Sequence, residues 1–61
     1  MAKERVGGVV VVRLDDNSDD LRIVRYVEDA GEARQLATEE VEKEGRRAVY
    51  VLPVVRMFTK S

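Results

Sequence analysis

The sequence predicts a small α+β protein, built as β-β-α-β around a three-stranded antiparallel sheet. Three observations predict this class. Two valine-rich segments flank an acidic loop, the next segment has apolar residues at helical spacing, and a long apolar stretch follows it. A chain of 61 residues has room for one domain, 1–61, and we expect its polar ends, 1–5 and 59–61, to be frayed. With the strands numbered along the chain, the expected sheet order is 2-1-3, with the helix on one face.

The first two strands should form a hairpin. Val6–Leu14 and Leu21–Val27 are rich in β-branched residues, and Asp15–Asp20 between them is typical of a turn. If Leu14 lies opposite Leu21, the helix-covered face holds Val10, Val12, Leu14, Leu21, Ile23 and Val27. The open face then holds Val9, Val11, Val24 and Tyr26.

The helix is expected over Ala30–Glu44. Its apolar stripe is narrow and mostly alanine, so the helix should lie close against the sheet: Ala33, Leu36, Ala37 and Val41. Asp29 and Glu32 have the spacing of an N-terminal capping pair. Gly45 occupies a position where a left-handed residue ends many helices.

The third strand, Arg47–Phe58, contains the most apolar part of the chain. Ala48–Phe58 carries a single charge, Arg56, and is apolar at both alternating positions. Proline cannot donate to a sheet ladder, so Pro53 should lie at an edge or a bend. Two readings stay open: one bent edge strand, or a strand whose Val54–Phe58 part pairs with a neighbouring subunit.

These features predict association with a second copy. A chain this short forms a marginal core, and it has no cysteine to form a disulfide. A single helix cannot cover both faces of the sheet, so homo-oligomerisation, most simply a two-fold dimer, should complete the fold. The predicted oligomer interface consists of Val9, Val11, Val24, Tyr26, Tyr50, Leu52, Val54 and Phe58.

The charges suggest an alternative. The net charge is −1, yet the expected strands carry arginines and no acid, while the loop and the helix hold most of the acids. The arginines could contact an anion or a nucleic-acid groove as a dimer: Arg13, Arg22, Arg25 and Arg56. Pairing of these arginines with acids would oppose that function.

The composition gives little support for catalysis or metal binding. Histidine and cysteine are absent, so we predict no enzyme, no cofactor and no metal site. Asp15, Asn17 and Asp19 match the opening of a calcium loop, but Asp20 and Tyr26 stand where that loop needs glycine and glutamate. No apolar run is long enough to span a membrane, and we expect a cytoplasmic protein.

The stretch EDAGEARQLATEEVEKEG with the apolar strand after it resembles one half of many small β-β-α-β accessory proteins from bacteria and phages. The sequence therefore predicts a non-catalytic, homo-oligomeric interaction module that acts as an adaptor, inhibitor or regulator of an unidentified protein partner.

Overall fold

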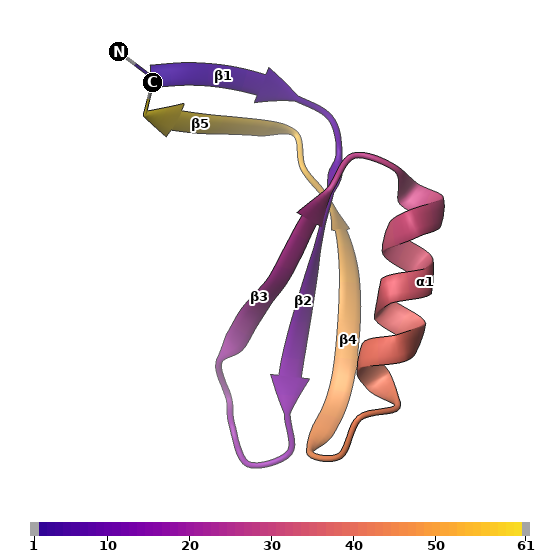
Figure 1. The fold of residues 1–61 in the computed structure, drawn as a ribbon. Coiled ribbons are helices and arrows are strands. Elements are labelled where there is room, and N and C mark those ends of the chain that lie inside the picture. The colour runs from indigo at the N-terminus through magenta and orange to yellow at the C-terminus, as the bar shows by residue number, and fades with distance from the viewer. Residues whose placement is uncertain (1, 61) are drawn as a thin grey trace.

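The computed structural model describes residues 2–60, which form five strands and one helix. In chain order these are β1 (Ala2–Val6), β2 (Val9–Asp15), β3 (Leu21–Val27), α1 (Ala30–Val41), β4 (Arg46–Pro53) and β5 (Arg56–Lys60). One antiparallel sheet has three strands in the order β3-β2-β4, and a separate antiparallel pair joins β1 to β5 (Figure 1). The α+β class with one helix and antiparallel strands is confirmed.

The expected single sheet of three long strands, in the order 2-1-3, is replaced by two sheets. The first long strand breaks at Gly7 and Gly8, whose φ angles of +89° and +85° cannot continue a strand. The last one breaks after Pro53, where β4 ends. Residues 2–5 and 59–60, expected to be frayed, belong to the β1–β5 pair, while residues 1 and 61 lie outside the described residues.

The hairpin register is confirmed at the loop end and shifts farther along. Leu14 lies opposite Leu21, and Val12 lies opposite Ile23, as predicted. The register then slips by one residue, so that Val11 pairs with Arg25 and Val24 becomes the extra residue of a β-bulge. Every pair beyond the bulge therefore differs from the prediction.

Helix α1 begins where the sequence predicts it and ends earlier. The Asp29 carboxylate accepts hydrogen bonds from the backbone N–H groups of Gly31 and Glu32, which confirms the N-cap. The helix ends at Val41 rather than at Glu44, and Gly45 follows with a φ of +82°.

The helix covers the opposite sheet face from the one predicted. Val11, Val27 and Ala33 form the core cluster, and the half-buried residues around it are Val9, Val24, Leu36, Ala37 and Val49. The bulge explains part of the difference, because it turns Val24 and Val27 toward the same side. The small side chains of Ala33 and Ala37 let the helix approach a face that is mostly valine.

The chain is extended for its size. Its radius of gyration is 12.8 Å, whereas a compact domain of this length has about 10.5 Å. The β1–β5 pair, which we call the terminal ribbon, projects from the body formed by the three-stranded sheet and α1 (Figure 1). Ala2 and Lys60 pair at the free end of this ribbon.

Candidate interaction surface

The candidate site is the face of the three-stranded sheet that the helix leaves uncovered, which we call the open face. Val12 lies opposite both Ile23 and Tyr50, and directly paired residues share a face. The same rule, applied along the ladder, gives the members of the open face: Val10, Val12, Leu14, Leu21, Ile23, Tyr26, Ala48, Tyr50 and Leu52.

Large apolar side chains of the open face are exposed. Ile23 is 75% exposed, and Leu21, Tyr50 and Leu52 are each at least two-fifths exposed. Val12 is buried because it lies on the central strand, between Ile23 and Tyr50. A soluble monomer rarely exposes so many neighbouring apolar side chains, so this face is suited to contact with another protein surface.

The structure divides the predicted interface residues into two groups. Tyr26, Tyr50 and Leu52 belong to the open face. Val9, Val11 and Val24 do not, because they pack in the core under the helix, and Val11 has no exposed surface. Two further members, Val54 and Phe58, lie outside the three-stranded sheet.

Leu21 and Ile23 belong to the exposed surface but were placed under the helix by the sequence analysis. The large size of these two side chains was the sequence signal that they lie on the face without the helix. A helix that presents Ala33 and Ala37 packs closely against small residues, whereas leucine, isoleucine and tyrosine would hold it away from the sheet. The valine face is therefore the better match for this helix.

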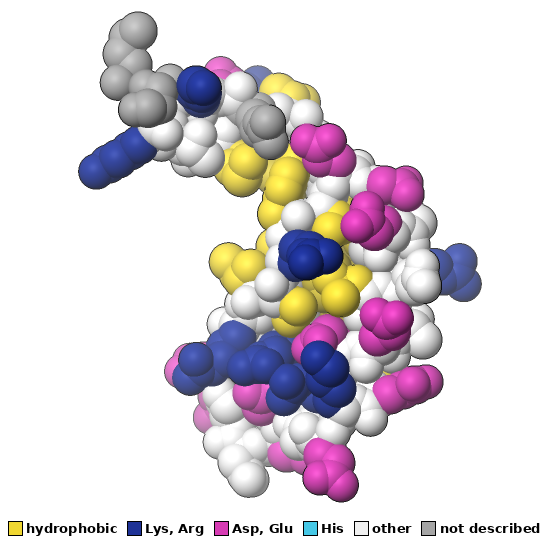
Figure 2. Space-filling view, in the orientation of Figure 1, with side chains coloured by type: hydrophobic (Ala, Val, Ile, Leu, Met, Phe, Trp, Pro, Cys, Tyr) yellow, Lys and Arg dark blue, Asp and Glu magenta, His cyan; other side chains and the backbone are white. Residues whose placement is uncertain are grey.

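The terminal ribbon exposes two further apolar side chains, on the side that also carries the Glu4–Arg56 ion pair. Residues 6 and 58 lie on the same side of the ribbon, since Val6 pairs with Arg56 and Glu4 pairs with Phe58. Val6 is 78% exposed and Phe58 is 65% exposed. Figure 2 shows the molecule hollowed on the side away from the helix, with hydrophobic side chains along the hollow below the ribbon.

The ribbon meets the body at a tight junction beside this hollow. The Tyr26 hydroxyl donates a hydrogen bond of 3.2 Å to the Gly7 carbonyl, and the Val54 N–H donates one of 3.0 Å to the Gly8 carbonyl. A Cβ atom at Gly8 would overlap the Tyr26 ring and hydroxyl. An open pocket of about 360 Å³ lies here, lined by Val6, Gly8, Tyr26 and Glu28. Its four lining residues place it between ribbon and sheet.

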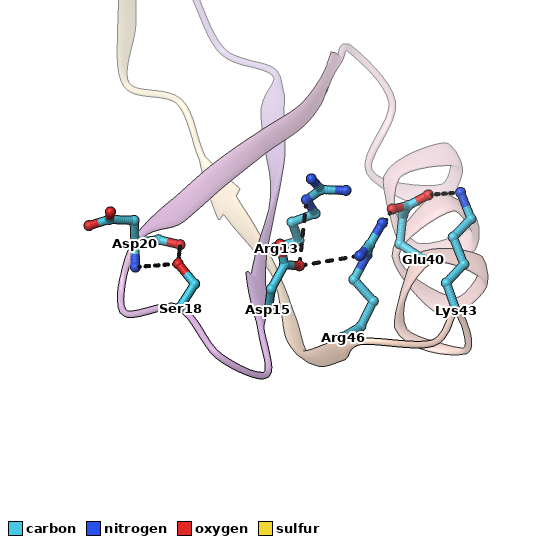
Figure 3. A network of polar contacts seen from close by, with 7 residues as sticks. All are labelled: Arg13, Asp15, Ser18, Asp20, Glu40, Lys43 and Arg46. Atoms are coloured by element: carbon cyan, nitrogen blue, oxygen red, sulfur yellow. Dashed lines mark hydrogen bonds and ion pairs between the residues drawn. The ribbon is translucent and has the colours of Figure 1, made fainter.

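Charged residues gather at the other end of the sheet, where β2 ends (Figure 3). Asp15, the last residue of β2, accepts a 3.3 Å hydrogen bond from Arg46 and lies 3.6 Å from Arg13 Nε. Arg46 Nε lies 3.6 Å from Glu40 on the helix, which is an ion-pair distance rather than a hydrogen bond. These contacts join β2, β4 and α1 and fix the last turns of the helix over the sheet.

Glu40 is the buried charge of this network, with 6% of its surface exposed. Lys43 donates a hydrogen bond to its carboxylate. This hydrogen bond, together with the positive charges of Lys43, Arg46 and Arg13, lowers the pKa of Glu40 and outweighs the opposing effect of burial. Glu40 therefore stays ionised at neutral pH.

Of the four arginines predicted to contact an anion, Arg13 and Arg22 lie directly opposite each other on β2 and β3. Arg13 is paired with Asp15, and Arg56 lies on the ribbon, 3.6 Å from Glu4. Arg22 and Arg25 lie on β3 and are exposed. Figure 2 shows a group of basic side chains over the lower end of the body, with acidic side chains beside them.

Within residues 2–60, no three potential metal-ligating side chains converge on one point. The one helix of the described chain is too short and too polar to cross a membrane. No protein-family model, curated protein or solved structure matches the chain, so a function has to be argued from the geometry alone.

Proposed function

We propose that this protein is a small interaction module that binds a second copy of itself through the open face, as a two-fold dimer. The observation that supports this most is its surface area. The chain exposes 4835 Å², whereas a compact monomer of 6.9 kDa exposes about 4,000 Å². The excess is about 800 Å², which equals one partner's share of a standard protein–protein interface.

The energetics also favour association. The apolar side chains that are buried within the described residues are few and small: Val11, Val12, Val27 and Ala33. Covering even half of the excess area with apolar contacts contributes on the order of 10 kcal/mol before the costs of association. That gain is large enough to offset a substantial part of the cost of association. The dimer would bind another protein as an adaptor or regulator and would not catalyse a reaction. It would act in the cytoplasm.

The alternative function, a dimer that binds nucleic acid, has weaker support. Arg22 and Arg25 are exposed on one strand, but Arg13 and Arg56 are each close to an acid. Nucleic-acid modules concentrate unpaired positive charge, and this chain has a net charge of −1. A gel-shift experiment at low salt, with both DNA and RNA, distinguishes the two functions. Binding that Arg22→Ala and Arg25→Ala abolish would favour the alternative.

Sedimentation equilibrium at micromolar concentration tests the proposal. The wild-type protein should sediment as a dimer, and Leu52→Asp should sediment as a folded monomer because it places a charge in the interface. Val41→Asp is a matched control, since Val41 is 43% exposed, compared with 40% for Leu52, but lies on the helix. A folded wild-type monomer, or a dimer that survives Leu52→Asp, would contradict the proposal.

A further inference from the structure

The terminal ribbon has no support from its own body. Apart from the junction at residues 7, 8 and 54, β1 and β5 contact each other and no other helix or strand of residues 2–60. A two-stranded antiparallel pair is marginally stable in water unless a third element covers one of its faces. The ribbon also exposes Val6 and Phe58 on one side. These properties are typical of a segment that is completed by another chain.

We infer that the terminal ribbon of each copy packs against the open face of the other copy, so that the dimer contains two equivalent ribbon contacts. This inference rests on the proposed dimer and specifies which surfaces of the two chains are in contact. In this arrangement a two-fold axis relates the copies, and each ribbon lies at the loop end of the partner's open face. Phe58 of one copy then packs on Leu21 and Ile23 of the other, which lie at that end of β3.

Charge complementarity supports this direction of the ribbon. Lys60, at its free end, is exposed and lies on the same side of the ribbon as Phe58. The loop that follows β2 in the second copy carries three exposed acids, Asp16, Asp19 and Asp20. The arrangement places these opposite charges beside each other at the rim, where they favour the correct orientation more than they add affinity.

Pairing of two β3 edges is a less favourable way to form the dimer. The bulge at Val24 interrupts the regular strand, and Arg22 and Arg25 place positive charges along it. Bulges and charged side chains are features that protect an edge strand from pairing with another chain. The contact should therefore be made by the open face and the ribbon.

Nuclear magnetic resonance on mixed dimers tests this arrangement. A spin label is attached at Thr59→Cys on one chain, and the other chain is wild-type and labelled with ¹⁵N. The chain has no native cysteine, and Thr59 is on the ribbon side opposite Phe58, so the label leaves the contact intact. We expect the amide signals of Leu21 to Ile23 and of the acidic loop to broaden. The same label at Glu39→Cys, on the exposed helix surface, should not broaden them.

The outcomes separate this inference from the proposed function. A dimer by sedimentation with broadening at Leu21 to Ile23 supports both. A dimer without that broadening overturns the ribbon arrangement and leaves the proposed function standing. A folded monomer overturns both.

A charge reversal gives an independent readout of the same arrangement. Lys60→Glu should weaken the dimer up to about fivefold, since exposed ion pairs contribute modestly. Combining Lys60→Glu with Asp20→Lys should restore most of the loss, because the two charges again have opposite signs. A double variant that is weaker than both single variants would overturn the direction assigned to the ribbon.

Discussion

The two faces of the three-stranded sheet differ in the size of their side chains and in what covers them. The covered face is mostly valine and packs against alanines of the helix. The open face presents Ile23, Leu21, Tyr50 and Leu52, which are larger and exposed. The comparison shows that one short helix covers a single face of the sheet, the one whose small side chains allow it to pack closely. The other face is left with large apolar side chains exposed.

The largest expected effect comes from placing the same aspartate on each face. Val11→Asp should prevent folding, because a fully buried charge without a partner costs more than about 4 kcal/mol. Ile23→Asp should leave the monomer folded and abolish the dimer. Circular dichroism measures the folding, and sedimentation measures the association.

The informative result is the difference in folding between Val11→Asp and Ile23→Asp. If Ile23→Asp unfolded the chain as completely as Val11→Asp, the open face would be part of an obligate core rather than a separable interface. If Val11→Asp folded normally, the assignment of the covered face would be wrong.

The junction between body and ribbon gives the next largest effect. Gly8→Ala should destabilise the fold by about 2–4 kcal/mol, because alanine resists a φ of +85° and its Cβ would overlap Tyr26. Gly7→Ala is a matched control, since its φ is +89° and nothing lies within 4 Å of the added atom. It should cost only about 1–2 kcal/mol, measured by urea unfolding. Equal losses for the two variants would mean that the contact with Tyr26 contributes nothing.

Local patterns were sufficient to predict the helix and the hairpin loop. The N-cap at Asp29 and the left-handed Gly45 are determined by neighbouring residues, so the sequence shows them directly. The pairing of Leu14 with Leu21 follows from the loop length. Each of these features depends on interactions over a few residues.

The parts that were mispredicted depend on longer-range information. Val9–Val12 is four valines, so alternation along β2 cannot say which face meets the helix. The bulge residue Val24 lies in an equally apolar strand and has no compositional signal. The β1–β5 pairing joins opposite ends of the chain, and β1 is too polar to resemble a strand. For these reasons only Tyr26, Tyr50 and Leu52 of the predicted interface lie on the open face.

A smaller effect is expected at the start of the helix that covers the valine face. Asp29→Ala removes the carboxylate that accepts from the N–H groups of Gly31 and Glu32. The loss should be about 1 kcal/mol in the free energy of unfolding, measured by urea titration. Asp29→Asn is the conservative control and should retain most of the stability, since asparagine caps helices equally well. A loss of similar size in Asp29→Asn would point to the negative charge rather than to the cap.

The smallest effect concerns the other end of the helix and appears only in acid. The pKa of Glu40 is lowered in the folded state from its usual value of 4.5. A lowered folded pKa means that the unfolded chain binds a proton more readily, so this contribution is complete above pH 4.5 and is lost as the pH falls through the folded value. Between pH 7 and pH 3, wild-type stability should therefore fall more than that of Glu40→Gln, which cannot titrate. Thermal unfolding at several pH values measures this, with Glu39→Gln, an exposed neighbour, as the control. Parallel pH curves for wild type and Glu40→Gln would contradict a lowered pKa of Glu40 in the folded state.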